Sequence, residues 1–547
     1  MTHRILLGAG TTVLTALVLL VSPDAAFACG GFFCSTAPID QAGENIVYSV
    51  ESDGSITTHV QILYQGEAQD FAWILPVPAE PEVSVGTDAL FIGLRNQTQP
   101  RFQVDDFQVE GTCRADPVCE FDSVLRSSRG PGDFNSAAPD PSAPNAEADD
   151  GVEVHFEGAV GPYNVATLSS GSSAALYEWL TENGYDIPDV SVPLLEDYVI
   201  KGDYFVALKL QQDRGVGEIQ PVVLRYREEK PCLPIRLTSI AATPDMPITA
   251  YVLASERAVP LNYMRVNLNL NEPALYGYSN GLNGSLFYSM LASQAIDDAG
   301  GQGFITEYAG PIPDLGIQIP DLTEVELFSA RSPTAALEAL QRSGLNRDPL
   351  MLPILLQHIP PPPQHADDPM NFYNCLARGG SCGADSVQFD GEALVAAIEE
   401  QILAPRREVV AMLGRHSKLT RLFTTMDPEE MTVDPLFDTV EGMAEVSNVH
   451  GATEIIECSP EFLRHDAPRS LVFPNGERVR VREGTPSTMT DEAYCRSVGG
   501  TARDAGFRGG GLDCSAGTPS RVGSAGGALA ALGLLLPLAL FLRRRHR

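Results

Sequence analysis

Positive charge is scarce in this sequence. The 547 residues include 37 Lys and Arg against 71 Asp and Glu, a net charge of −34, and no basic stripe runs through them. Proteins that bind nucleic acid need Lys and Arg to contact phosphates, so the composition disfavours that class of partner. The same negative charge repels anionic lipid headgroups, so attachment to a membrane would need a dedicated apolar segment.

The common cofactor and metal motifs are also missing. The glycine runs at 30–31 and 509–511 lack the lysine and helix that follow a phosphate-binding loop. Acidic pairs such as 149–150 lack the alternating pattern of a calcium loop. His358 and His365 flank a proline run at a spacing that fits neither a helix face nor a zinc knuckle. We therefore predict no cofactor and no metal ligands.

One stretch, residues 379–383, matches the G-x-S-x-G pattern of a nucleophile elbow. That chemistry needs a strand before the serine and a helix after it, with acid and histidine partners later in the chain. His416, His450 and His465 do follow, but no apolar strand leads into the motif and a predicted disulfide loop surrounds it. We interpret the match as chance, and the catalytic residues, if any, stay unknown.

The first 28 residues have the pattern of a secretory signal peptide. An apolar run at 5–21 follows His3 and Arg4, and an Ala-x-Ala site ends directly before Cys29. The alternative is a lipoprotein with Cys29 as the lipidated residue. Such sites usually carry Leu three positions earlier, where this chain has Ala26. The pattern favours ordinary cleavage and an exported protein.

Ten cysteines in an exported chain predict a set of disulfide bonds, although sequence does not fix their connectivity. Proximity favours Cys29–Cys34, Cys113–Cys119, Cys375–Cys382 and Cys495–Cys514, which leaves Cys232 with Cys458. Metal binding is the competing interpretation, but none of these spacings is that of paired zinc knuckles.

The C-terminal segment predicts the attachment to a membrane. Residues 526–542 are apolar and small, and four arginines and a histidine follow at 543–547. At 1.5 Å per residue this run spans roughly 25 Å, slightly less than the ~30 Å of a hydrocarbon core. The simpler interpretation is a permanent transmembrane helix whose arginines stay in the cytoplasm. The alternative is a sorting tail: the Cys-Ser-Ala-Gly start at 514, the spacer, the short span and the arginines together resemble the C-terminal sorting signals of myxobacterial surface proteins. This resemblance implies that Cys514 is a processing or attachment point, which would compete with a Cys495–Cys514 bond.

The first strands are the clearest elements. Apolar residues alternate through 45–51 and 56–64 with Asp53-Gly54 between them, the strongest short signal for a β-hairpin. The run 71–75 is apolar on both faces and indicates a buried strand, which we expect to complete a three-stranded meander.

Later segments change from strand to helix periodicity. Strands are predicted at 203–211, 218–226, 248–254 and 262–270, and helices at 88–95, 172–183, 332–344, 391–403 and 405–414. The fold class is therefore α+β, mainly β, with antiparallel sheets in the N-terminal two-thirds and a more helical, loop-rich C-terminal third.

Composition and periodicity suggest the following segments: signal peptide 1–28, β-rich region 29–125, flexible loop 126–151, second β-rich region with a helix 152–330, helical and loop-rich region 331–513, and C-terminal spacer, span and arginines 514–547. The loop is assigned because its Ser, Gly, Pro, Asn and Asp would bury too little apolar surface to offset the entropy of ordering.

Several motifs together resemble one bacterial family. They are Ala-Cys-Gly-Gly-Phe-Phe-Cys at 28–34, Gln-Ile-Leu-Tyr-Gln-Gly at 61–66, Asp-Phe-Ala-Trp-Ile-Leu-Pro-Val-Pro at 70–78, Gly-Pro-Tyr at 161–163 and Pro-Ile-Arg-Leu-Thr-Ser-Ile-Ala-Ala at 234–242. The sequence is similar to exported proteins with domain of unknown function 2330, over roughly residues 29–345. The tail from Cys514 resembles the C-terminal sorting signals of myxobacterial surface proteins. The first resemblance implies the compartment and the fold region, and no catalytic residues.

We expect an exported protein of the cell envelope, anchored at the surface by its C-terminal segment and acting as a binding or structural component. Its expected partners are the membrane, a sorting protease and a protein or glycan ligand that the sequence does not identify. The alternative is an envelope hydrolase whose site is distributed over loops. A deep pocket lined by His and carboxylates would favour the hydrolase, and a flat face with exposed aromatics would favour binding.

Overall fold

The computed structural model describes residues 40–65, 72–115, 119–120, 151–185, 187–211, 218–278, 284–323, 325–326, 332–378, 380, 382–383, 387, 389–486, 493 and 501–502. The signal peptide, Cys29, Cys34, the loop at 126–150, Cys495 and the C-terminal tail with Cys514 lie outside these residues. In the described part, no helix is both long and apolar enough to cross a membrane.

The chain divides into two compact units, Met1–Ala115 with Gly130–Ser487, and Asp116–Arg129 with Thr488–Arg547. In the second unit the structure describes one antiparallel pair, β6 (Cys119–Glu120) with β20 (Thr501–Ala502). All other elements belong to the first unit. The segment boundaries inferred from composition stay a prediction, and strands from three of those segments share one sheet.

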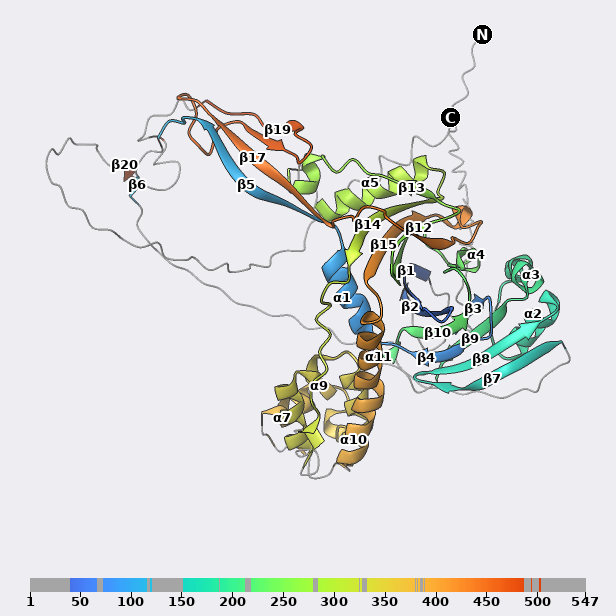
Figure 1. Cartoon of the computed structure of the whole chain (residues 1–547). Helices are drawn as coiled ribbons and strands as arrows, with labels where there is room; N and C mark the ends of the chain where they lie inside the picture. Colours follow the sequence, from blue (N-terminus) through green and yellow to red (C-terminus); the bar gives the residue numbers. More distant parts are fainter. Residues whose placement is uncertain are drawn as a thin grey trace, which may run out of the picture. The chain divides into compact units, whose positions relative to one another are not determined.

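That sheet has eight strands in the order β13-β14-β15-β11-β1-β2-β10-β4 (Figure 1). The strands are β1 (Asp40–Val50), β2 (Ser55–Gln65), β4 (Glu82–Val85), β10 (Val222–Arg227), β11 (Met246–Ala254), β13 (Met264–Val266), β14 (Gly303–Pro311) and β15 (Lys418–Met426). The pairs β1 with β11 and β13 with β14 are parallel, and the others are antiparallel.

The predicted hairpin is confirmed. β1 and β2 pair antiparallel from Val50 opposite Ile56, and Gly54 takes the positive φ of 79° that the turn requires. The predicted meander is wrong, because β3 (Ala72–Val77) pairs with β9 (Tyr204–Leu210) and not with β2. The second edge of β2 is already occupied by β10, so β3 joins another sheet. Every residue of β3 is buried, as its apolar sequence indicates.

The sheet that contains β3 has the order β3-β9-β8-β7, with β8 (Tyr163–Ser170) and β7 (Val152–Val160). One face packs against the helices α2 (Ser173–Glu182) and α3 (Val192–Lys201) through Ala72, Ile74, Leu168, Leu176, Trp179, Leu180, Leu195, Phe205 and Ala207. The other face packs on the eight-stranded sheet through a core that includes Trp73, Leu75, Val206 and Leu208 on one side and Ile46, Tyr48, Val60 and Leu224 on the other. Because successive side chains of β3 point to opposite faces, one set packs on the helices and the other on the eight-stranded sheet.

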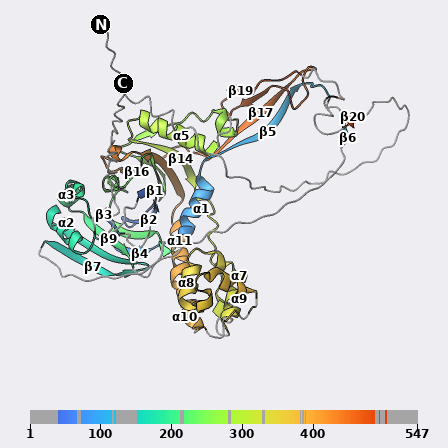
Figure 2. The same cartoon turned by 180° about the vertical axis from the view of Figure 1, so that it is seen from behind.

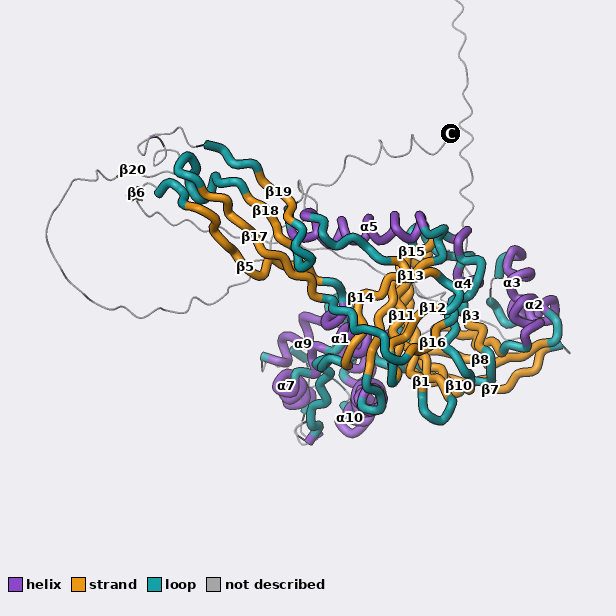
Figure 3. The backbone as a smooth tube through the Cα atoms, turned by 45° about the horizontal axis from the view of Figure 1, so that its top comes forward, coloured by secondary structure: helices purple, strands orange, loops and turns teal. Residues whose placement is uncertain are grey.

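The opposite face of the eight-stranded sheet is covered by α1 (Asp88–Thr98) and α11 (Ala404–Leu413), with Val47, Leu90, Leu94, Tyr251, Val409 and Leu419 in the shared core. This part of the molecule therefore has four layers: helices, a large sheet, a small sheet and helices. Figure 3 shows the strands of both sheets in orange and the covering helices in purple. The pairing of β1 with β11 and of β11 with β15 is what holds distant segments of the chain in one sheet.

The C-terminal third contributes a group of helices (Figure 2). They are α7 (Pro333–Ser343), α8 (Met351–His358), α9 (Pro369–Ala377) and α10 (Gly391–Ile398), which is continued by one π-helical turn (Glu399–Leu403) into α11. The predicted limits of α7 are confirmed, since Ser332 caps the backbone N–H of Ala335 and Gly344 ends the helix at φ 77°.

The remaining strands form two further sheets. One has the order β19-β18-β17-β5, from β19 (Arg478–Arg482), β18 (Arg469–Val472), β17 (Val449–Cys458) and β5 (Arg101–Gly111), and the other pairs β12 (Arg257–Pro260) with β16 (Phe437–Val440). The two other α-helices in the described part are α4 (Ile235–Thr238) and α5 (Gly284–Asp298). The α+β, mainly β fold class is confirmed, with sheets that mix parallel and antiparallel pairs.

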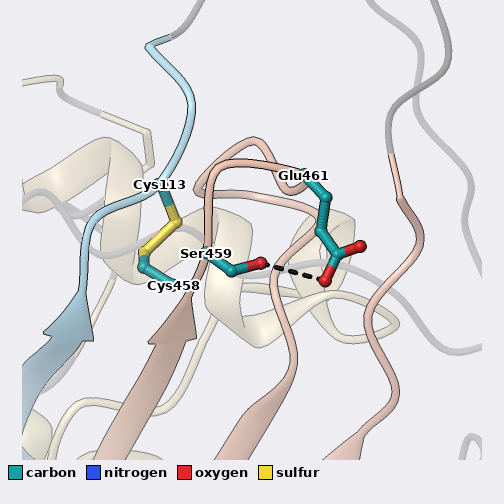
Figure 4. The surroundings of a disulfide bond; sticks show 4 residues. All are labelled: Cys113, Cys458, Ser459 and Glu461. Carbon is teal, nitrogen blue, oxygen red and sulfur yellow. Dashed lines mark hydrogen bonds between the residues drawn. A yellow bond between two sulfur atoms is a disulfide. The ribbon is translucent and has the colours of Figure 1, made fainter.

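The disulfides correct two predicted pairings. Cys113 bonds to Cys458, so the Cys113–Cys119 and Cys232–Cys458 pairings are wrong (Figure 4). The reason is strand pairing: β5 and β17 run parallel with Gly111 opposite Cys458, which brings cysteines 345 positions apart to a Cα distance of 4.4 Å. Cys375 does bond to Cys382, as proximity suggests, and Cys232 carries a free thiol in the described part.

Candidate functional site

A cavity of about 310 Å³ lies between the two packed sheets of the first unit. Its floor is the inward face of β1, β2 and β10, and its opposite wall is β3 with Pro78 directly after it. The end of α3 and two loop segments, at 228–234 and 434–436, complete the lining. This volume is at the lower end of the range typical of small-molecule sites.

Strand alternation decides which side chains face the cavity. Along β1, Glu44, Ile46 and Tyr48 share the inward face because they are two residues apart. The antiparallel register places Val60 of β2 opposite Ile46 and Thr58 opposite Tyr48. The predicted alternation of β1 is thus confirmed, and one of its two faces forms this floor.

The apolar part of the lining consists of aliphatic and proline side chains: Ile46, Val60, Leu75, Pro76, Val77, Pro78, Leu224, Pro234 and Leu436. The polar part comprises five carboxylates (Glu44, Asp203, Glu228, Glu229 and Asp434), two lysines (Lys201 and Lys230), three phenols (Tyr48, Tyr198 and Tyr226), the Thr58 hydroxyl and the Cys232 thiol. A lining with an apolar body and a few placed polar groups is what a small organic ligand requires.

Among the carboxylates of the lining, Asp434 is buried, at 7% exposed, and two donors hold one of its oxygens. Its Oδ1 accepts a hydrogen bond from the Tyr198 hydroxyl at 2.9 Å and another from the backbone N–H of Arg236 at 3.2 Å. Its Oδ2 is buried without a hydrogen-bond partner among the described residues. The Lys201 ammonium lies 3.8 Å from Oδ2, beyond hydrogen-bond range, and 5.0 Å from the centre of the Tyr198 ring.

Burial shifts the acidity of the groups around Asp434. It raises the pKa of Asp434 itself, against the two hydrogen bonds and the lysine that lower it. It raises the pKa of Asp203 to about 6, while Lys201 lowers that pKa and the charges of Asp434 and Glu228 add to the rise. The pKa of the Cys232 thiol rises to about 12, first through burial and then through Asp434, so this thiol is protonated and unreactive at neutral pH.

The phenols at the cavity are held in fixed positions. The Tyr48 hydroxyl donates to the Cys232 carbonyl at 2.8 Å, and Tyr226 and Thr58 share a hydrogen bond at 3.0 Å. Burial raises the pKa of Tyr48 and Tyr226, so both are neutral. The Tyr48 hydrogen bond ties the 228–234 loop to β1, and the bridge between Cys232 and Leu436 joins that loop to the 434–436 segment.

A second cavity of about 490 Å³ lies beside the N-terminal end of α1. Three of its four charged side chains are engaged, because Arg406 forms an ion pair with Asp348 and Asp88 accepts a hydrogen bond from Gln61. Both carboxylates of this cavity therefore already have a partner. The first cavity, where Asp434 Oδ2 can still accept a hydrogen bond, is therefore the better candidate for a ligand site.

The histidines noted in the sequence do not gather into a catalytic site. His416 Nε2 lies 2.6 Å from Ser49 Oγ and 3.8 Å from Glu51, but the serine is fully buried. In a catalytic triad the acid contacts the other ring nitrogen, whereas Glu51 stands on the same side as the serine and accepts its hydrogen bond at 2.8 Å. Arg415 also holds Glu51, so this cluster fixes the start of β15 to β1.

Other predicted site residues lie apart from the cavity. Gly379 and Ser381 of the G-x-S-x-G match are outside the described residues, and Cys382 belongs to a disulfide. His450 stacks on Phe102 at 5.1 Å in the β5 and β17 sheet. Within the described part, no group of three or more His, Cys, Asp and Glu is close enough to hold a metal ion. Of the predicted disulfide residues that the structure describes, Cys232 is the one that lines the cavity.

Sequence reasoning missed Asp434, because no motif surrounds it. The fold and the cavity define a two-sheet α+β protein with a site suited to a small ligand. Residues 23–327 match the model of the family described as "Uncharacterized protein conserved in bacteria (DUF2330)", and the chain belongs to this family. The resemblance to this family inferred from the sequence motifs is thereby confirmed, and the resemblance of the C-terminal tail to sorting signals stays a prediction. Among curated proteins and solved structures there is no match to the chain.

Proposed function

We propose that this chain is an exported, surface-anchored protein of the bacterial envelope that binds a small ligand in the cavity between its two packed sheets. The observation that carries the binding proposal is the cavity itself, with its apolar body and the Asp434 Oδ2, which has an ammonium at 3.8 Å but no hydrogen-bond partner among the described residues. A buried carboxylate oxygen without a hydrogen bond costs free energy, which a ligand donor would recover.

Export is supported by the signal-peptide pattern at 1–28 and by two disulfides in the described part, since such bonds persist in oxidising compartments. Anchoring is supported by the apolar run and arginines after residue 525. A further proposed partner is a sorting protease that processes the tail. It is supported by the resemblance of the segment from Cys514 to myxobacterial sorting signals.

The binding proposal is tested by filling the cavity. Leu75→Trp places an indole in the space beside β3, and Leu286→Trp on α5, at an exposed position, is the matched control. Ligand-observed NMR with a library of small charged and neutral organic molecules should find ligands of the wild-type chain and of the control. Leu75→Trp should abolish their binding. An absence of ligands, or ligands that Leu75→Trp leaves unaffected, would contradict this function.

Anchoring is tested separately by fractionation of cells. The full chain should be found with the membrane or the cell surface, and a variant ending at residue 523 should be released in soluble form with its disulfides intact. Persistence of the truncated chain on membranes after a high-salt wash would point to another anchor, with lipidated Cys29 as the first candidate.

A further inference from the structure

The charges that line the cavity favour one sign of ligand. Five carboxylates stand against two lysines in the lining, within a chain whose net charge is −34. Both lysines also have carboxylate partners: Lys230 contacts Asp438 at 2.9 Å, and Lys201 lies 3.8 Å from Asp434. An anionic ligand would therefore enter a strongly negative site, where both cations of the lining are already neutralised.

The Asp434 carboxylate provides the specific contact for a cation. Its Oδ1 is saturated by Tyr198 and by the Arg236 backbone, whereas Oδ2 has no hydrogen-bond donor in the described part. The group that covers Oδ2 is the Lys201 ammonium, at a distance where attraction remains and no hydrogen bond forms. Lys201 is the last residue of α3 and its side chain is 54% exposed, so the lysine has a path to leave for solvent.

The rest of the lining fits the body of such a ligand. Leu75, Val77 and Leu224 lie on facing strands of the two sheets and supply apolar walls. The Tyr198 ring already has an ammonium 5.0 Å from its centre, which shows that a cation is accommodated over this face. Asp203, directly before β9, adds a second carboxylate at the α3 end of the cavity.

Resting on the proposed function, we infer that the ligand is an organic cation: a primary amine or guanidinium group attached to an apolar body. The cationic group binds Asp434 Oδ2 in the position beside which the Lys201 ammonium lies, and the apolar body lies between β3 and β10. Lys201 therefore competes with the ligand, as an internal occupant of the same carboxylate.

The test uses three probes with one body and different head groups: 4-phenylbutylamine, 4-phenylbutanol and 4-phenylbutyrate. Isothermal titration of the exported full chain should give binding for the amine, weaker binding for the alcohol and the weakest for the carboxylate. Asp434→Asn, which keeps the shape of the side chain, should weaken amine binding at least tenfold. Asp367→Asn, at an exposed position outside the cavity, should leave amine binding unchanged.

Lys201→Met should change the affinity for the amine in the opposite direction from Asp434→Asn. Removal of the competing ammonium should tighten amine binding several-fold, whereas a site for anions would lose affinity with the same change. Because Asp434→Asn removes a buried contact, Asp203→Asn at the more exposed end serves as a second variant and should also weaken the amine. A single cooperative thermal transition shows that each variant is folded.

The outcomes separate the two proposals. Binding of the alcohol or the carboxylate at least as tight as that of the amine, blocked by Leu75→Trp, would leave the binding function intact and overturn the inference of a cation. The same inference fails if Lys201→Met weakens the amine or Asp434→Asn has no effect. If none of the three probes binds the wild-type chain, the cation inference is overturned, and the library screen then decides on the binding function itself.

Discussion

The hydrogen bond from Tyr198 to Asp434 offers the sharpest test of the structure around the cavity. Tyr198 is 2% exposed, and its hydroxyl is one of two donors to a buried carboxylate oxygen, at 2.9 Å. Hydrogen bonds to charged groups contribute about 1.5–3 kcal/mol, so Tyr198→Phe should destabilise this part of the chain by about 2 kcal/mol. The ring stays in place, since only the hydroxyl is removed.

The chain carries its own probes for this measurement. Its two tryptophans are Trp73 in β3 and Trp179 in α2, both buried in the cores on either side of the small sheet. Urea unfolding followed by tryptophan emission therefore reports on the layers next to the cavity. The control is Tyr185→Phe in the same helical layer, because the Tyr185 hydroxyl makes no hydrogen bond to another described residue, and it should cost less than about 1 kcal/mol.

A double-mutant cycle measures the interaction energy between Tyr198 and Asp434. Combining Tyr198→Phe with Asp434→Asn should give a coupling energy of about 1–2 kcal/mol, because the two side chains are in direct contact. A coupling below about 0.5 kcal/mol, or a Tyr198→Phe cost no larger than that of Tyr185→Phe, would refute the assigned hydrogen bond.

Three further predictions follow from the same contacts. Burial raises the Asp203 pKa from 3.8 to about 6, so the folded chain holds this proton more tightly, and the contribution to stability is full below about pH 4 and lost as the pH rises to about 6. Asp203→Asn should therefore reduce the change in urea midpoint between about pH 4 and 6, whereas Asp367→Asn should not. Arg421 and Glu307 form a buried ion pair, with the residues 7% and 4% exposed, so Arg421→Met should lower the free energy of unfolding by about 3–5 kcal/mol. Adding Glu307→Leu should recover most of this loss, because no unpaired charge then stays buried, and equal stability of the single and double variants would contradict the prediction. Removal of residues 524–547 should leave urea stability of the body unchanged while cell fractionation finds the chain in the soluble extracellular fraction, and a lower midpoint would mean that the tail packs on the body.

The local elements of the fold could be predicted because their signals are local. The Asp53-Gly54 turn with alternating flanks defines the β1 and β2 hairpin, and Ser332 with Gly344 defines the ends of α7. The burial of β3 was also predictable from its unbroken apolar run. Its partner was not, because an apolar run shows that both faces are covered and gives no information on which strand takes each edge.

The disulfide and the cavity depend on contacts between distant segments. Cys113 meets Cys458 only because β5 and β17 pair in parallel, a register that sequence proximity does not contain. The cavity draws on residues near positions 46, 76, 200, 230 and 434, each from a different element, so no spacing marks it. Asp434 is distinguished by its burial and by an oxygen, Oδ2, that has no hydrogen-bond partner in the described part, and both properties exist only in the folded chain.

The central claim, that the cavity binds a ligand through Asp434, is tested most directly by a crystal structure of the chain with 4-phenylbutylamine. The account predicts electron density for the amine between β3 and β10, with its nitrogen at about 2.7–3.2 Å from Asp434 Oδ2 and the Lys201 ammonium displaced toward solvent. An empty cavity at saturating amine, or an amine bound elsewhere with Lys201 still beside Asp434, would contradict it.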